Sequence, residues 1–280
     1  MNTIDLFNTG ITPTWCPGCG NFGILMALKN ALTKLAIPNH DTAIVYGVGC
    51  HGNMRDWMHV YGVEGLHGRA LPVAQGIKLA NSKLTVIAET GDGDCMGEGG
   101  NHFIHAAKRN PNITVIVHDN QVYGLTTGQA APTAQKKLIT KSTPSGVVEP
   151  PLLPVSLALV AGATFVSRGF AGDIPGLTDI LMKAIQHKGF SVVDILQPCV
   201  TFNKAYPHQW YKDHIYAIHP MQTRQEALGK SMEWGPKIPV GVFFDEVRDT
   251  SEDIESVATT PLVDSSLGIP KRDEILDMFV

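Results

Sequence analysis

The sequence has few of the features that mark membrane, secreted or polyanion-binding proteins. No apolar run reaches the ~18–20 residues that a membrane-spanning helix needs, and the opening residues, MNTIDLFNTG, lack the basic and apolar segments of a secretory signal. The net charge is −4 and no long run of Lys or Arg occurs, which gives no support for nucleic acid as a partner. We therefore expect a cytoplasmic protein that binds neither membranes nor nucleic acid.

Cysteine is also scarce, with five in 280 residues. In a reducing compartment disulfides are rare, and a Cys-x-x-Cys pair there more often indicates a metal or redox site. Cys16 and Cys19 form such a pair in the turn-rich stretch WCPGCG. The composition, with 44% hydrophobic and 17% charged residues, is that of a globular protein with a sizeable core, and it argues against a disordered or fibrous chain.

Short β-branched runs alternate with longer helical patterns along most of the chain. We predict strands at residues 42–48, 83–90, 112–119, 163–170 and 190–197. We predict helices at residues 21–36, 70–81, 97–109, 154–161 and 173–188. This alternation predicts an α/β fold, a parallel sheet with helices on both faces, over residues 1–199. We expect the irregular segment 120–153 to be functional or mobile, and 200–280 to form an irregular C-terminal extension.

Polar residues follow two of the predicted strands. Gly91, Asp92, Gly93 and Asp94 stand between a strand and a helix, where glycines let backbone N–H groups approach a diphosphate and a carboxylate can hold Mg²⁺. Asn120 follows the next strand, and neighbouring parallel strands would bring it close to Asp92. Gly-Asp-Gly also occurs in ordinary turns and nucleotide-binding loops, so the motif alone leaves those interpretations open.

Five blocks of sequence carry a family resemblance. They are TWCPGCGNFGIL, YGVGCHGN, LHGRALPVAQGIKLAN, the run from GDGDCMGEGG to GLTTGQAAPT, and LQPCVTFN. In this order they resemble the β subunit of two-subunit 2-oxoacid:ferredoxin oxidoreductases over about residues 12–215. The resemblance implies the diphosphate-side fold of thiamine diphosphate enzymes. It also implies oxidative decarboxylation of a 2-oxoacid to acyl-CoA and CO₂, with coenzyme A as co-substrate and single electrons passing through a [4Fe–4S] cluster to ferredoxin.

The resemblance implies two sets of metal ligands. The cluster ligands would be Cys16, Cys19, Cys50 and Cys199. The Mg²⁺ ligands would be Asp92, Asn120 and the backbone carbonyl of Val122. Four thiolates by themselves would suit Zn²⁺ equally well. Cys95 matches no ligand position, and we expect it to be a buried structural thiol.

Further residues match positions beside thiamine diphosphate in the family. These cofactor-binding candidates are Gly49, Cys50, His51, His67, Gly68, Arg69, Gly93, Asp94, Gly124 and Leu125. His51 and His67 are also the catalytic candidates. Because Cys50 belongs to the cluster set while its neighbours contact the cofactor, the resemblance predicts a short electron path between the two groups.

The resemblance also implies a second domain, which supplies a glutamate to the aminopyrimidine of thiamine diphosphate, and we expect one α/β unit of about 200 residues to leave no room for it in this chain. We therefore expect an α subunit as partner, in a heterodimer or a dimer of heterodimers, with 200–280 packed on the core or on that partner. The stretch PCVTFN favours 2-oxoglutarate as substrate, with pyruvate as the second candidate. The alternatives are a non-oxidative thiamine diphosphate lyase or synthase and a zinc-stapled nucleotide-binding module.

Overall fold

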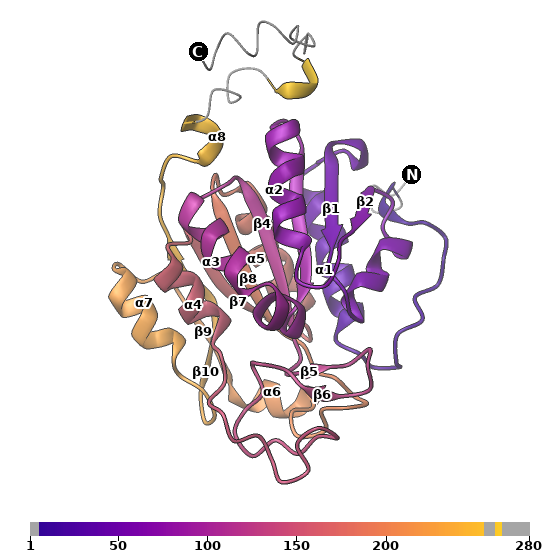
Figure 1. The fold of residues 1–280 in the computed structure, drawn as a ribbon, viewed down its shortest axis with the longest axis vertical. Helices are drawn as coiled ribbons and strands as arrows, with labels where there is room; N and C mark the ends of the chain where they lie inside the picture. The colour runs from indigo at the N-terminus through magenta and orange to yellow at the C-terminus, as the bar shows by residue number, and fades with distance from the viewer. Residues whose placement is uncertain (1–5, 255–260, 265–280) are drawn as a thin grey trace, which may run out of the picture.

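A computed structural model describes residues 6–254 and 261–264 and has one large sheet at its centre (Figure 1). Its strands, in spatial order, are β2 (Tyr61–Glu64), β1 (Thr42–Tyr46), β3 (Thr85–Gly91), β4 (Ile113–Asp119), β8 (Phe190–Leu196), β7 (Phe165–Phe170), β10 (Ile238–Asp245) and β9 (Ile215–Ile218). All neighbours pair in parallel except β10 and β7, which are antiparallel. The predicted parallel α/β fold is confirmed.

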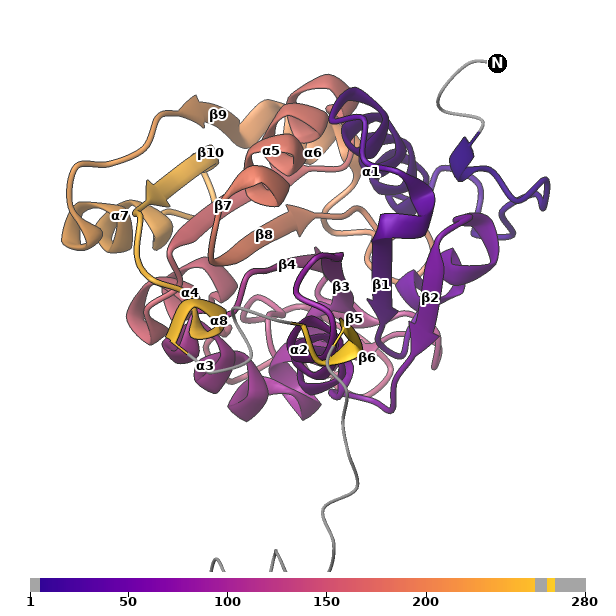
Figure 2. The same cartoon turned by 90° about the horizontal axis from the view of Figure 1, so that it is seen from above.

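Helices cover both faces of this sheet (Figure 2). On one face lie α1 (Asn21–Lys34) and α5 (Ile174–Gln186), whose apolar side chains share a core with a 3₁₀-helix, His51–Trp57. On the other lie α2 (Ala70–Ala80), α3 (Gly100–Arg109), α4 (Pro154–Ala161) and α7 (Arg224–Ser231). The central strands are buried along their length, as expected for a parallel sheet covered on both sides.

Two features differ from the sequence-based expectation in this part of the chain. The predicted helix over 97–109 is split into a π-helical turn, Gly93–Glu98, and α3. π-Helical turns are rare in proteins overall, and many of those that occur lie at functional sites. Strand β2 had no sequence signal because it is a four-residue edge strand that is exposed throughout. In the ranges that the structure describes, no helix is long and apolar enough to span a bilayer.

The segment after residue 199 adds more regular structure than its sequence suggests. It contains α6 (His208–His214), β9, α7 and β10, and the two strands extend the central sheet beyond β7. Its strands were missed because β9 is short and half-exposed, and because β10 carries Pro239 and Gly241 within its run. The boundary at residue 199 stays a prediction, and 255–260 and 265–280 lie outside the described residues.

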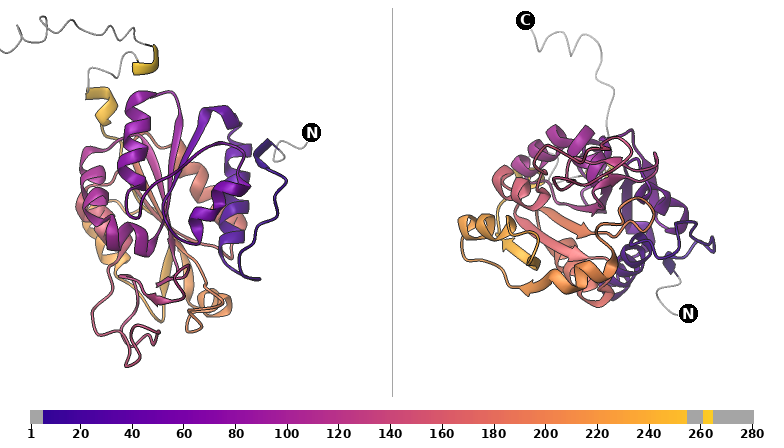
Figure 3. Two further views of the ribbon diagram at one scale, coloured as in Figure 1. Left: turned by 45° about the vertical axis from the view of Figure 1, so that its right-hand side comes forward. Right: turned by 90° about the horizontal axis from the view of Figure 1, so that it is seen from below.

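The carboxyl ends of the central strands meet at one edge of the sheet. The irregular segment that follows β4 gathers at this edge with α6 and a small hairpin, β5 (Val122–Tyr123) and β6 (Gln129–Ala130) (Figures 1 and 3). Ligands of parallel α/β sheets bind at such an edge. This edge is therefore the expected position of a ligand-binding site.

Candidate functional site

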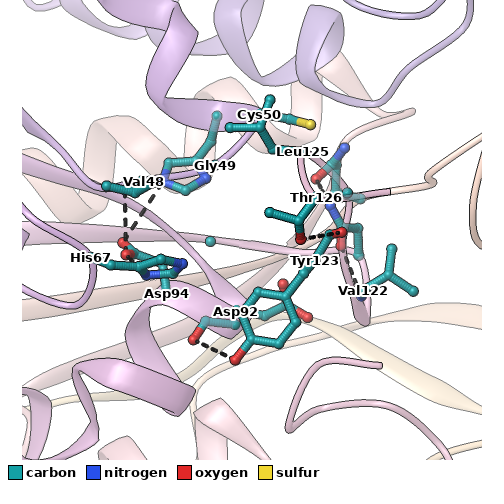
Figure 4. Close-up of a pocket in the computed structure, with 16 residues that line it drawn as sticks. Val48, Gly49, Cys50, His67, Asp92, Asp94, Val122, Tyr123, Leu125 and Thr126 are labelled. Atoms are coloured by element: carbon teal, nitrogen blue, oxygen red, sulfur yellow. Dashed lines mark hydrogen bonds and ion pairs between the residues drawn. The ribbon is translucent and has the colours of Figure 1, made fainter. Parts of the chain in front are cut away.

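The loops after four parallel strands line one pocket at this edge (Figure 4). Its lining comes from 48–51 after β1, 91–94 at the end of β3, Asn120 and 122–126 after β4, and Gln197 after β8, with His67 added from the loop before α2. The structure thus brings Asp92, Asn120 and Val122 into one pocket, together with most of the cofactor-binding candidates.

Asp92 is a buried carboxylate held by protein donors. Its Oδ2 accepts a hydrogen bond from the Gln121 backbone N–H at 2.8 Å and from the Thr133 hydroxyl at 2.5 Å. Burial nevertheless raises the pKa of Asp92 to about 6, because the charged form loses solvation that these bonds only partly replace. The pKa values of Asp119 and Asp194 are raised by burial as well.

These three carboxylates form a buried acidic group behind the pocket. Asp194 is paired with the Arg168 guanidinium, with Nε 3.1 Å from Oδ2, while the Oδ1 atoms of Asp119 and Asp194 are buried and have no hydrogen-bond partner among the residues that the structure describes. The negative charges of Asp194 and Asp92 raise the pKa of Asp119 further, because they oppose its ionisation. A cation bound on the pocket side would relieve this repulsion.

Asn120 has both ends of its side-chain amide engaged. Its Oδ1 accepts from the Val122 backbone N–H at 3.0 Å, and its Nδ2 donates to Gln197 Oε1 at 3.0 Å. The intervening Gln121 adopts φ of +65°, a left-handed conformation that is uncommon for residues other than glycine. This turn directs the Gln121 N–H to Asp92. The resulting hydrogen bond connects the end of β4 to the end of β3.

Asp94 lines the pocket but is engaged within the chain. Oδ1 accepts from the Gly68 N–H at 2.7 Å and lies 2.6 Å from His67 Nδ1, while Oδ2 accepts from the Thr90 hydroxyl at 2.7 Å. A Cβ at Gly47 would stand 1.8 Å from Oδ2, so only glycine leaves room for the carboxylate there. The Asp94 side chain therefore ties together the loops that surround the pocket.

His51 is buried against the pocket, with Nε2 3.8 Å from Asp94 Oδ2. Burial lowers the pKa of His51 well below its usual value, and the nearby His118 and His67 rings lower it further, so the ring is neutral. Behind it, the buried His118 contacts Glu89 through Nε2 and Asn21 through Nδ1. His67 is half-exposed and lies at the pocket rim.

Not all of the cofactor-binding candidates face the pocket. Gly68 contributes its backbone N–H to Asp94, and the exposed Arg69 side chain lies outside the lining, with Nη1 3.4 Å from the Glu98 carbonyl. Gly124 and Leu125 do line the pocket. A Cβ at Gly124 would be 3.3 Å from Cys50 Sγ, so this loop passes close to the sulfur.

A second cavity of about 240 Å³ adjoins the first and brings four thiols together. They are those of Cys16, Cys19, Cys50 and Cys199. The Cys19 N–H donates to the Cys16 carbonyl at 2.9 Å in a tight turn, and the Gly20 N–H donates to the Pro198 carbonyl at 3.2 Å, which docks the turn beside Cys199. Cys95 is buried in the core on the other side of the sheet, away from this set. Its burial was predicted, and its structural role stays a prediction.

The four thiols are close enough to influence one another. Burial, and to a smaller extent the neighbouring thiols, raise the pKa of both Cys19 and Cys50 to about 11. Within the described ranges, no three His, Cys, Asp or Glu side chains are placed to hold a single metal ion. Four thiolates that line one cavity are a donor set for either an iron–sulfur cluster or zinc.

The two cavities share part of their lining. The shared residues are Cys50, Asn120, Gly124, Leu125 and Gln197. Gln197, which the sequence did not single out, stands directly after β8, the same kind of position that drew attention to Asp92 after β3. Tyr123 was also missed: its ring lies against Gly93, where a Cβ would come within 2.4 Å of it. Neither residue type is by itself a metal or acid–base signal.

Comparisons with known proteins identify two matching families and several similar proteins. Residues 47–195 match the family described as "Thiamine pyrophosphate enzyme, C-terminal TPP binding domain", and 199–259 match the C-terminal family of the pyruvate ferredoxin oxidoreductase beta chain. Subunit beta of 2-oxoacid:ferredoxin oxidoreductase 1 from Aeropyrum pernix is 41% identical over 262 residues, covering 88% of this chain and 82% of the relative. The 2-oxoglutarate synthase subunit KorB from Archaeoglobus fulgidus is 38% identical over 246 residues, covering 88% and 90%.

A solved structure is similar over nearly the whole chain. It is a 2-oxoglutarate:ferredoxin oxidoreductase from Magnetococcus marinus with 2-oxoglutarate, coenzyme A and succinyl-CoA bound. The TM-score is 0.91 at 33% identity, with 99% of this chain and 96% of that chain covered.

The hydrogen bonds of Asp94 lead to a stability prediction. Asp94→Ala leaves the buried Gly68 N–H without its acceptor and should lower the free energy of unfolding of the cofactor-free chain by about 1–3 kcal/mol. Asp179→Ala, which removes an exposed partner of Lys34, is the control and should change it by less than about 0.5 kcal/mol. Urea denaturation followed by circular dichroism measures both. Equal stability of the two variants would contradict the structural role of Asp94.

Proposed function

Because the chain belongs to the β subunits of the 2-oxoacid:ferredoxin oxidoreductase family, which are oxidoreductase subunits that work with a partner subunit, we propose its reaction from that premise. With an α subunit, it would catalyse oxidative decarboxylation of a 2-oxoacid to acyl-CoA and CO₂. The reaction would depend on thiamine diphosphate and coenzyme A, and ferredoxin would accept the electrons. The observation that carries the proposal is the shared lining of the diphosphate-side pocket and the four-thiol cavity.

The pocket fits a magnesium ion and a diphosphate. We propose Asp92, Asn120 and the Val122 carbonyl as the Mg²⁺ ligands, since hard oxygen donors suit that ion. The buried acidic group of Asp92, Asp119 and Asp194 has the Arg168 guanidinium on Asp194, and a divalent cation would offset the remaining negative charge. Gly93 and Gly124 would let the backbone approach the diphosphate closely.

The second cavity fits a [4Fe–4S] cluster. Four soft thiolates are the usual donor set for such a cluster. Support for Cys16, Cys19, Cys50 and Cys199 comes from their common cavity, which shares Cys50 with the pocket around Asp92. A zinc-stapled nucleotide-binding module, the remaining alternative, would carry zinc in place of iron on the same four thiols.

Thiamine diphosphate, when bound, supplies the carbanion stabilisation that loss of CO₂ from a 2-oxoacid requires. The chain's own residues orient and shield that chemistry. His51 presents a neutral, buried ring at the pocket wall, and among the described residues its Nε2 has no hydrogen-bond partner, so this atom is available for a hydrogen bond to a bound group. His67, at the rim, is the second catalytic candidate. Cys50 lines both cavities, so it would provide a short path for electrons from the thiamine diphosphate pocket to the four-thiol cavity.

Partners complete the site. The pocket lining contains no glutamate among the described residues, and we propose that the α subunit supplies the one that faces the aminopyrimidine. A basic cavity lined by Lys136, Lys137 and Lys204 shares Thr201 and Phe202 with the four-thiol cavity. An acidic ferredoxin could dock there by charge complementarity, close to the thiols.

The substrate is proposed to be 2-oxoglutarate, with pyruvate as the second candidate. This preference follows the stretch PCVTFN and agrees with the similarity to the 2-oxoglutarate synthase subunit of Archaeoglobus fulgidus and the 2-oxoglutarate:ferredoxin oxidoreductase of Magnetococcus marinus. A non-oxidative thiamine diphosphate lyase or synthase would use the diphosphate-side pocket but has no need of the four thiols. Because free thiols and iron–sulfur ligands persist in a reducing compartment, we propose the cytoplasm as the location.

Asp92→Asn tests the Mg²⁺ assignment. The asparagine still accepts the Gln121 N–H but loses the charge that would hold the ion. We expect the Mg²⁺-dependent affinity of the α–β complex for thiamine diphosphate to fall by more than about 100-fold, since loss of outer-shell partners alone costs about 10–100-fold. Isothermal titration calorimetry measures it, with Asp179→Asn as the exposed control. An affinity within about threefold of wild type would refute the assignment.

Cys50→Ser tests the thiol set, with Cys95→Ser as the matched control. A serine hydroxyl is a hard, weakly acidic ligand, so the cluster should be lost or become a three-iron species. Ferredoxin reduction should then fall by at least about 100-fold, whereas Cys95→Ser should keep four irons per chain and near-wild-type reduction. Iron content and EPR of the reduced complex give the result. Loss of iron in Cys95→Ser with retention in Cys50→Ser would show that the ligand set is wrong.

A further inference from the structure

Gln197 joins the two cavities through its side-chain amide. It is 2% exposed, and its backbone N–H donates to the Asp119 carbonyl at 2.9 Å, which fixes the main chain where β8 ends. The side chain accepts from Asn120 Nδ2 at 3.0 Å and donates through Nε2 to Cys19 Sγ at 3.4 Å. A Cβ at Gly20 would stand 2.8 Å from Gln197 Cγ, so the cysteine turn leaves space for this side chain.

The direction of these hydrogen bonds is set from one end. The Val122 backbone N–H can only donate, so the atom of Asn120 that it meets must be Oδ1. Asn120 then donates through Nδ2 to Gln197, so the accepting atom of Gln197 is Oε1. The other amide atom of Gln197, Nε2, therefore faces Cys19 and donates to its Sγ. A thiolate can only accept, so the chain of bonds ends with the correct polarity. Asn120 and Gln197 are both buried, which leaves little water to substitute for a lost partner.

We propose that Gln197 is a positioning residue that links the metal side of the pocket to the cluster and raises the reduction potential of that cluster. This inference rests on the proposed function, because it needs a cluster on Cys19 and a cation at Asn120. A hydrogen bond to a ligand sulfur stabilises the more negative, reduced state, and so makes the cluster a better electron acceptor.

The link would also respond to occupancy of the metal site. With a cation on its Oδ1, Asn120 would be a stronger donor through Nδ2–H to Gln197. Hydrogen bonds in a buried chain polarise one another, so Gln197 Nε2–H would also bind Cys19 Sγ more strongly. Filling the metal site would therefore raise the reduction potential of a cluster held by Cys19.

Redox titrations of the α–β complex, followed by EPR, test this inference. Gln197→Met removes the amide but keeps a neutral side chain of similar volume. At the wild-type midpoint potential, we expect the ratio of reduced to oxidised cluster to fall about tenfold, which for a one-electron couple is about 59 mV toward more negative potential. Wild type should show a higher potential with Mg²⁺ and thiamine diphosphate than without them, and this difference should be smaller in Gln197→Met.

Gln75→Met is the matched control. Gln75 is half-buried on α2, lines neither cavity, and donates through Nε2 to the Leu71 carbonyl rather than to a sulfur. Its potential, and the response to Mg²⁺ and thiamine diphosphate, should match wild type. If Gln197→Met does not retain iron, Asn120→Leu, measured without Mg²⁺ or thiamine diphosphate, removes the donor to Gln197 and should lower the potential in the same direction.

The outcomes separate the inference from the proposed function. A Gln197→Met complex with four irons and the wild-type potential would overturn the inference and leave the function intact. An Asn120→Leu complex with the wild-type potential would do the same. A wild-type complex that binds no iron would overturn the proposed function and the inference together.

Discussion

Parallel, in-register pairing of β1, β3, β4 and β8 is the constraint on which the site depends. It places the ends of four strands at one edge, so that residues distant in sequence, such as Cys50, Asp92, Asn120 and Gln197, meet there. Few of these residues would have a function alone. The loops after β1 and β8 each line both cavities. The strand register that forms the pocket around Asp92 therefore also positions residues of the four-thiol cavity.

Buried charge sets the electrostatics of this edge. Asp92 and Asp119 are held away from water with raised pKa values, whereas the ring of His51 is neutral because burial lowers its pKa and disfavours its cation. Asp94, by contrast, is surrounded by backbone and hydroxyl donors and serves as a fixed anchor between loops. Two carboxylates in one Gly-Asp-Gly-Asp motif thus have different tasks, decided by the partners that each one meets.

Much of this arrangement could be predicted from the sequence, and the rest depended on tertiary contacts. The family resemblance and the parallel α/β fold are confirmed by relatives covering most of the chain and by the sheet itself. Strands with continuous β-branched runs, such as β4, were predicted because burial on both faces leaves that signature. Strands β9 and β10 were not predicted, because short or proline-containing strands near a sheet edge lack this signature.

The residues of the candidate site also divide into those that the sequence indicated and those that it did not. Asp92 and Asn120 could be paired from their positions after neighbouring strands, whereas Gln197 carries no charge and becomes informative only when its two partners are known.

The most direct measurement of the central claim is EPR of the α–β complex mixed anaerobically with 2-oxoglutarate and coenzyme A, and with pyruvate in parallel. If this chain joins a thiamine diphosphate site to a [4Fe–4S] cluster through Cys50, a reduced-cluster signal should develop only when 2-oxoacid, Mg²⁺ and thiamine diphosphate are all present, and it should be absent in Cys50→Ser. A complex that contains zinc in place of iron, or that turns over 2-oxoacid with no change in an intact cluster, would contradict the account.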